Sequence, residues 1–162
     1  MSSEMELAAK KFFSSSRFAV AGASADTKKF GYKILAWYHE HSLPVTPINP
    51  RLDAINLPSK TYRTAASPSA LEFPKQTSLS IVTPPKATLA ILREAKAAEI
   101  PAVWLQPGTF DDEVAAYARK EFPASAVFGE DEFTRGGEGW CVLVDGENAL
   151  DAAGVNWTSQ KL

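Results

Sequence analysis

Residues 18–24 read Phe-Ala-Val-Ala-Gly-Ala-Ser, and this stretch decides the fold class. Its first four residues are apolar without a polar alternation, which is typical of a parallel strand that is buried on both faces. A glycine ends the run, and the apolar residues between 30 and 41 predict a helix after a short loop. A buried strand that passes through a small-residue turn into a helix is the first unit of an α/β sheet.

The same unit recurs along the chain. Further apolar runs predict strands at 44–49, 78–82, 102–106 and 125–128, and helices are predicted over 3–14, 84–98 and 111–121. Ser3 and Glu6 have the spacing of a capping box, and two prolines open the helix at 84. The prolines within 44–49 place that strand at an edge or make it short. The alternation predicts a single domain with a doubly wound, Rossmann-like parallel sheet of about five strands.

The remaining segments are harder to assign. Residues 51–64 are expected to form a loop, and a helical turn capped by Ser67 is expected at 67–73. We divide the chain into a Rossmann-like domain at 1–130 and a C-terminal extension at 131–162, packed on the domain or peripheral to it. The acidic run at 130–132 is expected to be solvated, and residues 141–144 are expected to add an edge strand.

Composition and charge exclude several classes of function. A net charge of −2 over 162 residues gives no overall attraction to nucleic acid or to an anionic membrane. The single cysteine, Cys141, excludes an intramolecular disulfide, and with only two histidines a zinc site is short of ligands. The first residues do not have the pattern expected of a signal peptide, and no apolar run approaches the length that crosses a bilayer. We therefore expect a cytoplasmic protein, and a homo-oligomer or a partner subunit stays open.

In a doubly wound sheet, ligands bind at the carboxyl ends of the strands, where the strand order reverses. The first strand ends in Gly22-Ala23-Ser24, and Gly31 follows where the next helix begins. Such a turn lets backbone N–H groups approach a phosphate beside a helix N-terminus, and Lys28 and Lys29 suit a pyrophosphate. The spacing is not Gly-x-Gly-x-x-Gly, so an ordinary βα turn explains the same residues equally well.

The other strand ends refine the kind of ligand. The second strand ends in Asn49-Pro50-Arg51, where an NAD site would place an acid against the ribose hydroxyls. This pattern argues against NAD and tolerates a phosphorylated ribose, which both NADP and coenzyme A carry. After the third strand, the prolines at 84–85 form a rigid wall for a flat adenine, although they also suit a helix start. Gln106 is a neutral polar group after the fourth strand.

Taken in order, segments 20–24, 29–33, 45–50, 83–85 and 103–108 resemble the stand-alone CoA-binding-domain proteins, which are similar to the N-terminal CoA-binding domain of the succinyl-CoA synthetase α subunit. The resemblance covers about residues 10–128 and implies a Rossmann-like domain with coenzyme A on its strand ends. The cofactor-binding residues that it implies are Gly22, Ala23, Ser24 and Gly31 at the phosphates, with Lys29 and Arg51 as phosphate partners, Asn49 and Pro50 along the nucleotide cleft, Thr83, Pro84 and Pro85 on the adenine side, and Gln106 at the far rim. The chain departs from the family after residue 128.

Catalytic groups are not evident in the sequence. There is no Gly-x-Ser-x-Gly elbow, and His39 and His41 fall at the end of a predicted helix, where a cation favours the helix dipole. Cys141 is more simply an inert cysteine than a reactive thiol. Three hypotheses follow: a protein that binds coenzyme A or an acyl-CoA without chemistry of its own, a small NADP-binding oxidoreductase-like protein, and an interaction module on a degenerate Rossmann scaffold.

Overall fold

The structure is a computed structural model that describes residues 3–129, 134–135 and 139–162. Its helices are α1 (Glu4–Phe12), α2 (Phe30–Glu40), α3 (Pro85–Ala97), α4 (Asp112–Glu121) and α5 (Val142–Ala152). Its strands are β1 (Arg17–Ala21), β2 (Val45–Ile48), β3 (Ala54–Asn56), β4 (Thr61–Arg63), β5 (Thr77–Ile81), β6 (Ala102–Leu105) and β7 (Ala126–Val127). Two short 3₁₀ turns, η1 (Pro68–Ala70) and η2 (Pro74–Gln76), precede β5.

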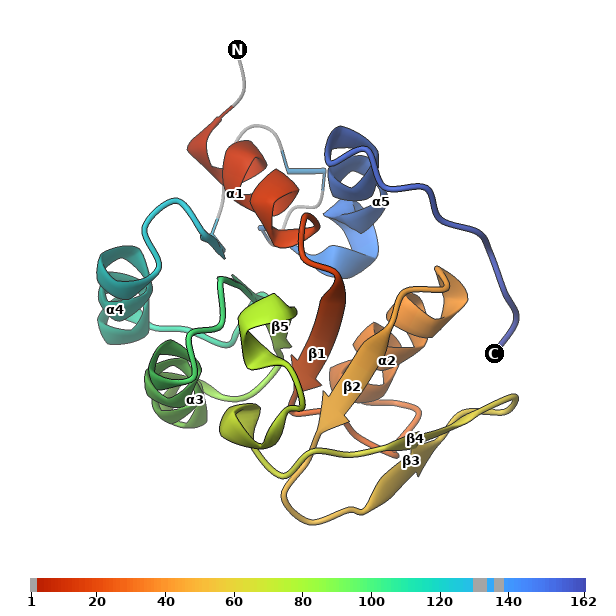
Figure 1. Cartoon of the computed structure of the whole chain (residues 1–162). Coiled ribbons are helices and arrows are strands. Elements are labelled where there is room, and N and C mark those ends of the chain that lie inside the picture. The colour runs from red at the N-terminus through yellow and green to blue at the C-terminus, as the bar shows by residue number, and fades with distance from the viewer. Residues whose placement is uncertain (1–2, 130–133, 136–138) are drawn as a thin grey trace.

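Five parallel strands form the main sheet in the order β2-β1-β5-β6-β7, and Figure 1 labels the first three of them. From β1 the chain steps outward to β2, and it then returns to the other side of β1 to form β5. The direction in which successive strands are added therefore reverses between β1 and β5. In a doubly wound sheet a crevice opens at this point, outside the carboxyl ends of the strands. The predicted Rossmann-like α/β fold is confirmed.

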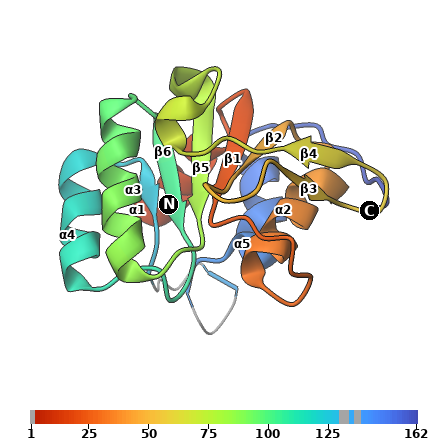
Figure 2. The same ribbon diagram turned by 90° about the horizontal axis from the view of Figure 1, so that it is seen from below.

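Helices cover both faces of this sheet. Helices α1, α2 and α5 pack on one face around Phe12, Tyr38 and Trp104, whereas α3 and α4 pack on the other around Leu92 and Val114. Figure 2 shows α3 and α4 on one side of the strands and α2 and α5 on the other. Each large side chain that is fully buried in these clusters contributes roughly 1.5–3 kcal/mol of transfer free energy, so burial on both faces stabilises the sheet.

Side-chain caps begin two of the helices. The Ser3 hydroxyl accepts from the Glu6 N–H while the Glu6 carboxylate accepts from the Ser3 N–H, which confirms the predicted capping box of α1. The Asp111 carboxylate accepts from the Val114 N–H at 2.9 Å and caps α4 in the same way. These caps satisfy helix N–H groups that have no partner within the helix.

The edge strand β2 is closed on its outer side. Pro47 has no N–H to offer, and its carbonyl accepts from the Ala65 N–H at 3.0 Å. One residue pair further, the Asn49 N–H donates to the Ala65 carbonyl at 3.0 Å. The prediction that the prolines mark an edge is confirmed.

The prediction of a loop at 51–64 is wrong, because this segment contains the antiparallel hairpin of β3 and β4. Ile55 and Tyr62 face each other in the pair and are both buried, whereas Asn56 and Thr61 are exposed. A strand of three residues offers a single inward position, so the alternation that reveals a strand is too short to recognise.

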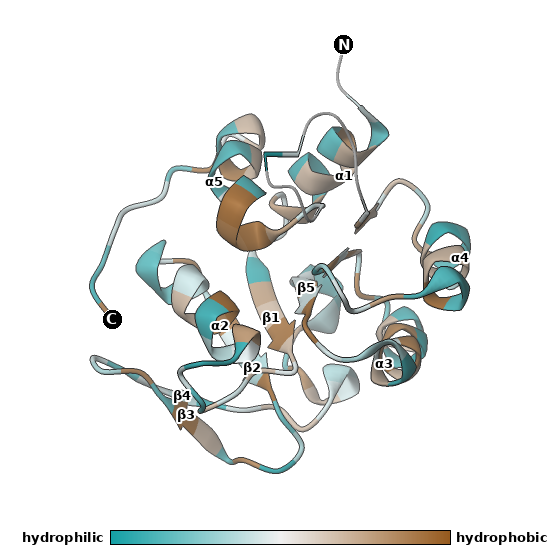
Figure 3. Ribbon diagram, turned by 180° about the vertical axis from the view of Figure 1, so that it is seen from behind, coloured by the Kyte–Doolittle hydropathy of each residue, from teal (hydrophilic) through white to brown (hydrophobic). Residues whose placement is uncertain are grey.

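The prediction of an edge strand at 141–144 is also wrong, because α5 begins at Val142. The cause is Asp145, which is 2% exposed and accepts from the Cys141 N–H at 3.0 Å, the Arg135 N–H and the Thr134 hydroxyl. This carboxylate organises the start of the helix. Figure 3 shows how hydrophobic the first turn is, and Leu143 and Val144 are partly exposed there.

The segment after α5 runs along α2 toward the hairpin (Figure 1). The Gln160 N–H donates to the Glu40 carbonyl at 2.9 Å, and the Ser42 hydroxyl donates to the Thr158 carbonyl at 2.7 Å. The division at residue 130 stays a prediction, and the acidic run at 130–132 lies outside the described residues. Within the described ranges, every helix is too short or too polar to span a membrane.

Candidate functional site

A cleft of about 520 Å³ opens at the carboxyl ends of β1, β2 and β5, beside the reversal of strand order. Strand ends, the connection after β4 and one face of α3 all contribute to it. The lining residues are Ala21, Gly22, Ala23, Ser24, Lys29, Ile48, Asn49, Pro50, Ala66, Ser67, Pro68, Val82, Thr83, Pro84, Ala87, Ala90, Ile91 and Glu94. This is the position at which doubly wound sheets bind their ligands.

The loop after β1 depends on two glycines. Gly22 has φ +88°, and a β-carbon there would lie 2.8 Å from the Val82 side chain. At Gly31 a β-carbon would overlap the Gly22 carbonyl oxygen. The first turn of α2 is therefore brought directly against the end of β1, as in folds that bind phosphates at this helix terminus.

The rest of this loop is held by its own polar groups. The Ser24 hydroxyl accepts from the Asp26 N–H at 3.0 Å, and the Asp26 carboxylate accepts from the Lys28 N–H at 3.0 Å. Lys29 occupies the N-cap position of α2, and its side chain makes no hydrogen bond to the N–H groups of the first turn. Those groups and the Lys29 ammonium suit an anion.

Asn49 connects this loop to the end of β2. Its amide Nδ2 donates to the Ala23 carbonyl at 2.9 Å, and its Oδ1 accepts from the N–H groups of Arg51 at 2.8 Å and Leu52 at 3.1 Å. The bond to Ala23 fixes the loop after β1 relative to the end of β2, and the other two bonds shape the turn that follows β2. Asn49 thus lines the cleft and also sets its shape.

The opposite wall is formed by the end of β5 and by α3. The Thr88 hydroxyl donates to the Thr83 carbonyl at 3.0 Å and ties the first turn of α3 to the strand end. From this wall Pro84, Ala87 and Ile91 present apolar surface to the cleft. Of the charged side chains in the described lining, Lys29 belongs to the glycine loop and Glu94 to the third turn of α3.

Most of the predicted site residues meet at this cleft. Gly22, Ala23, Ser24, Lys29, Asn49, Pro50, Thr83 and Pro84 line it, whereas Gly31, Arg51, Pro85 and Gln106 are not among the lining residues. Gly31 lies behind the loop, and Gln106 is buried, with its Oε1 accepting from the Val142 N–H at 3.0 Å. The place of these residues in a cofactor site stays a prediction.

Sequence reasoning missed the lining residues on α3 and on the connection after β4. Ala87, Ala90, Ile91 and Glu94 follow the three- and four-residue spacing of one helix face, and that spacing was the available signal. For Ala66, Ser67 and Pro68 no comparable signal exists, because only the tertiary path of the chain brings them over the cleft.

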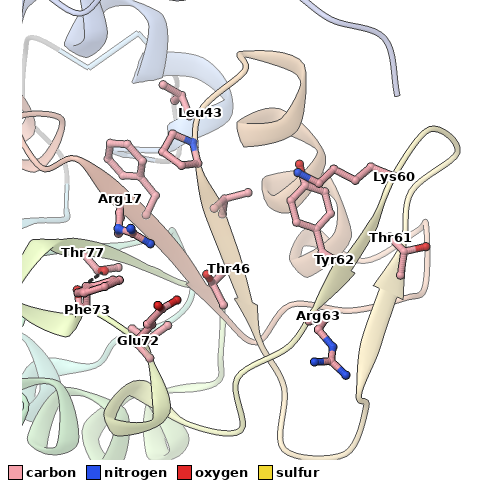
Figure 4. A pocket seen from close by; sticks show the side chains of 14 residues that line it. Arg17, Leu43, Thr46, Lys60, Thr61, Tyr62, Arg63, Glu72, Phe73 and Thr77 are labelled. Atoms are coloured by element: carbon pink, nitrogen blue, oxygen red, sulfur yellow. Dashed lines mark hydrogen bonds between the residues drawn. The ribbon is translucent and has the colours of Figure 1, made fainter.

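Two other hollows lie close to the sheet. One, of about 350 Å³, shares Asn49, Pro50 and Ala66 with the cleft and adds Arg63. The other, of about 310 Å³, lies at the amino ends of β1, β2 and β5, with Arg17 and Glu72 on one side and Lys60 and Arg63 on the other (Figure 4). No predicted site residue lines this second hollow.

The two histidines and the cysteine lie outside the cleft lining. His39 bonds to the Tyr62 hydroxyl at 2.8 Å and to the Lys161 carbonyl at 2.9 Å, so it joins α2, the hairpin and the C-terminal segment. His41 donates to the Trp37 carbonyl at 2.6 Å. Cys141 is partly exposed at the start of α5. In the part of the chain that the structure describes, His, Cys, Asp and Glu nowhere gather into a possible metal site.

Comparison with known proteins identifies the family and the fold of the chain. A family model described as a CoA binding domain matches residues 16–131. A conserved hypothetical protein from Pyrococcus furiosus is 30% identical, with 65% of this chain and 86% of that one covered and a TM-score of 0.58. A Thermus thermophilus protein is 26% identical over 74% of this chain and 87% of its own, with a TM-score of 0.60. A hypothetical protein from Pyrococcus horikoshii, 19% identical over 75% and 81% with a TM-score of 0.62, shares the fold. None of the curated proteins compared with the chain matches it.

Proposed function

Because the chain belongs to the CoA-binding domain family, we propose that the cleft at the carboxyl ends of β1, β2 and β5 binds coenzyme A or an acyl-CoA. The observation that carries the proposal is the close approach of Gly31 to the Gly22 carbonyl, which brings a helix N-terminus against the cleft. A diphosphate at this point meets backbone N–H groups, a positive helix end and the Lys29 ammonium.

The walls of the cleft suit the adenosine part of the same ligand. Pro50 and Pro84 are rigid and apolar, and Ala87 and Ile91 continue the apolar surface along α3. A flat base inserted between them removes apolar surface from water at roughly 25 cal/mol per Å². A phosphorylated ribose beside Asn49 would reach the adjoining hollow, where Arg63 supplies a cation.

We propose binding without chemistry on the bound ligand. Lys29 and Glu94 are the titratable side chains of the described lining; the hydroxyls of Ser67 and Ser69 donate to the Glu94 carboxylate, and the described lining holds neither a histidine nor a cysteine for covalent catalysis. A carrier, sensor or partner-subunit role fits such a site. An NADP-dependent reductase and an interaction module are the outcomes that the experiments below must separate from this proposal.

Thermal unfolding in the presence of different nucleotides tests the proposal. A ligand at 100 times its Kd adds about 2.7 kcal/mol to the free energy of unfolding. For a domain of this length each kcal/mol shifts Tm by about 2–4 °C, so we expect saturating coenzyme A to raise Tm by roughly 5–10 °C. NADP and NAD at equal concentration should leave Tm within error of the unliganded protein.

Native mass spectrometry of the purified protein supplies an independent measurement. We expect a retained species with the mass of coenzyme A or of an acyl-CoA. Stabilisation by NADP together with hydride transfer to a carbonyl compound would replace the proposal with the reductase. If no nucleotide binds, and a bulky residue at Gly22 leaves function in cells intact, the interaction module is the better description.

A further inference from the structure

The two charged side chains of the cleft lining belong to different parts of it. Lys29 adjoins the glycine loop, where the phosphates are proposed to bind. Glu94 is nine residues beyond the first residue of α3, which begins beside Thr83 and Pro84 at the end of β5. At about 1.5 Å per residue, Glu94 lies roughly 13 Å along the helix from that strand end. An anionic group of a ligand is attracted by Lys29 and repelled by Glu94, so these two parts of the cleft differ in the charge that they favour.

The carboxylate of Glu94 is held in place by the turn η1. Its Oε2 accepts from the Ser69 N–H at 3.0 Å. Burial acts to raise the pKa of Glu94, but this hydrogen bond and those from the Ser67 and Ser69 hydroxyls outweigh it, and the pKa lies below its usual value. Glu94 is therefore ionised at neutral pH. An ionised carboxylate is an acceptor only, with about four lone-pair positions, so the donors of Ser67 and Ser69 leave room for a further hydrogen bond.

Apolar groups occupy the cleft between Lys29 and Glu94. On α3, Ala87, Ala90 and Ile91 precede Glu94 on the same face, and Pro68 of η1 lies across the cleft. This surface suits the faces of an aromatic ring. The group that such a ring presents to Glu94 must donate a hydrogen bond, because a carbonyl oxygen there would face a carboxylate.

We propose that Glu94 is a specificity-determining residue that selects adenine by accepting a hydrogen bond from its exocyclic amino group. The proposal rests on the proposed function and adds to it the choice of base and the direction of the ligand. The phosphates lie at Lys29 and the amino edge of the base lies at Glu94. Hypoxanthine, which carries a carbonyl oxygen in place of the amino group, is disfavoured in the same position.

The test compares coenzyme A with the analogue in which hypoxanthine replaces adenine, by calorimetric titration of the whole chain. Hydrogen bonds to charged groups are worth about 1.5–3 kcal/mol, so the wild-type protein is expected to prefer coenzyme A by at least about tenfold. This ratio requires no variant. Equal affinity of the wild-type protein for the two compounds would overturn the proposal.

The variant Glu94→Gln sharpens the test. Glutamine can accept from an amino group or donate to a carbonyl, so the preference should fall to within about twofold. The side-chain oxygen of glutamine still accepts from the Ser69 N–H, which preserves the contact with η1. Glu113→Gln, an exposed change on α4, is the matched control and should keep the full preference.

A role for Glu94 in folding alone gives a different result. In that case Glu94→Gln weakens both ligands by the same factor and leaves their ratio unchanged, which contradicts the proposal. If coenzyme A binds but the wild-type ratio is near one, only the assignment of Glu94 fails. If neither compound binds to the wild-type protein, the proposed function itself fails.

Discussion

Gly31, the second residue of α2, lies so close to Gly22 that a β-carbon on Gly31 would overlap the Gly22 carbonyl oxygen. The end of β1 and the first turn of α2, which are separated by the loop at 23–29, thus touch through their backbones. Because Gly22 also has a positive φ, both positions require glycine for separate reasons. The contact sets how closely the α2 N-terminus approaches the cleft.

Gly31→Ala is expected to separate α2 from the end of β1. Overpacking of this kind typically costs about 1–3 kcal/mol of unfolding free energy, and we expect the affinity for coenzyme A to fall at least about tenfold, equivalent to 1.4 kcal/mol. Urea unfolding and calorimetric titration measure the two effects. Lys33→Ala, an exposed change in the same helix, is the control. Unchanged affinity in Gly31→Ala would show that binding of coenzyme A does not depend on this contact.

Asn49→Ala should loosen the loop from the end of β2. The variant leaves the Ala23 carbonyl and the N–H groups of Arg51 and Leu52 without their partners. Loss of these bonds is expected to cost about 1–3 kcal/mol, with a parallel loss of ligand affinity. Chemical denaturation checks the stability term. Asn156→Ala, at an exposed position after α5, should be nearly neutral, and an equal effect of both substitutions would count against the role of Asn49.

Lys29→Ala should weaken coenzyme A binding, whereas Lys28→Ala should not. The two lysines are neighbours in one exposed loop, but only Lys29 is among the cleft residues. Exposed ion pairs are worth about 0.2–1 kcal/mol, so we expect a loss of up to about fivefold for Lys29→Ala that shrinks as salt is added. Titrations at low and high ionic strength measure it. Equal losses in the two variants would mean that the net charge of the loop matters rather than the position of Lys29.

Tyr38 should make the protein unfold more easily in alkali. Burial raises the pKa of the Tyr38 hydroxyl well above its usual value, and the hydrogen bond with the Ser80 hydroxyl at 2.6 Å offsets this only in part. Above about pH 10 the unfolded chain releases this proton while the folded protein keeps it. The contribution of protonated Tyr38 to the free energy of unfolding is therefore fully present below about pH 10 and declines as the pH rises.

Tyr38→Phe tests this dependence. A proton that the folded protein keeps and the unfolded chain releases lowers the free energy of unfolding by about 1.4 kcal/mol for each pH unit. In Tyr38→Phe this part of the decline above about pH 10 should be missing. Tyr62, whose pKa is also raised by burial, should keep its own share. Near neutral pH the unpaired Ser80 hydroxyl should cost about 1–3 kcal/mol. Denaturation at a series of pH values measures both effects, and an identical slope in variant and wild type would contradict the assignment to Tyr38.

Strands β1 and β6 could be predicted because the sequence there has a short, continuous apolar run that glycine or proline follows within two residues. The run at 18–22 corresponds to β1, and the run at 102–106 corresponds to β6. Segment 141–144 shows the limit of this reasoning. A run of Cys-Val-Leu-Val has the composition of a strand, and the buried carboxylate of Asp145 makes it the start of a helix instead.

The candidate site was predictable at the strand ends and not beyond them. Gly22, Asn49 and Pro84 follow strands directly, so the rule for doubly wound sheets points to them. Glu94 lies in the third turn of a helix with an unremarkable amphipathic sequence. Its place in the cleft depends on η1, whose path along α3 is set by tertiary packing.

The proline in β2 bears on how this protein meets other copies of itself. Open sheet edges are where folded chains join into larger sheets and, eventually, into fibrils. Here the exposed flank has lost one donor to Pro47, and the backbone of Ala65 already occupies neighbouring positions. A strand from another copy would meet few unpaired N–H and C=O groups along β2, so the protein's own backbone protects this edge from aggregation.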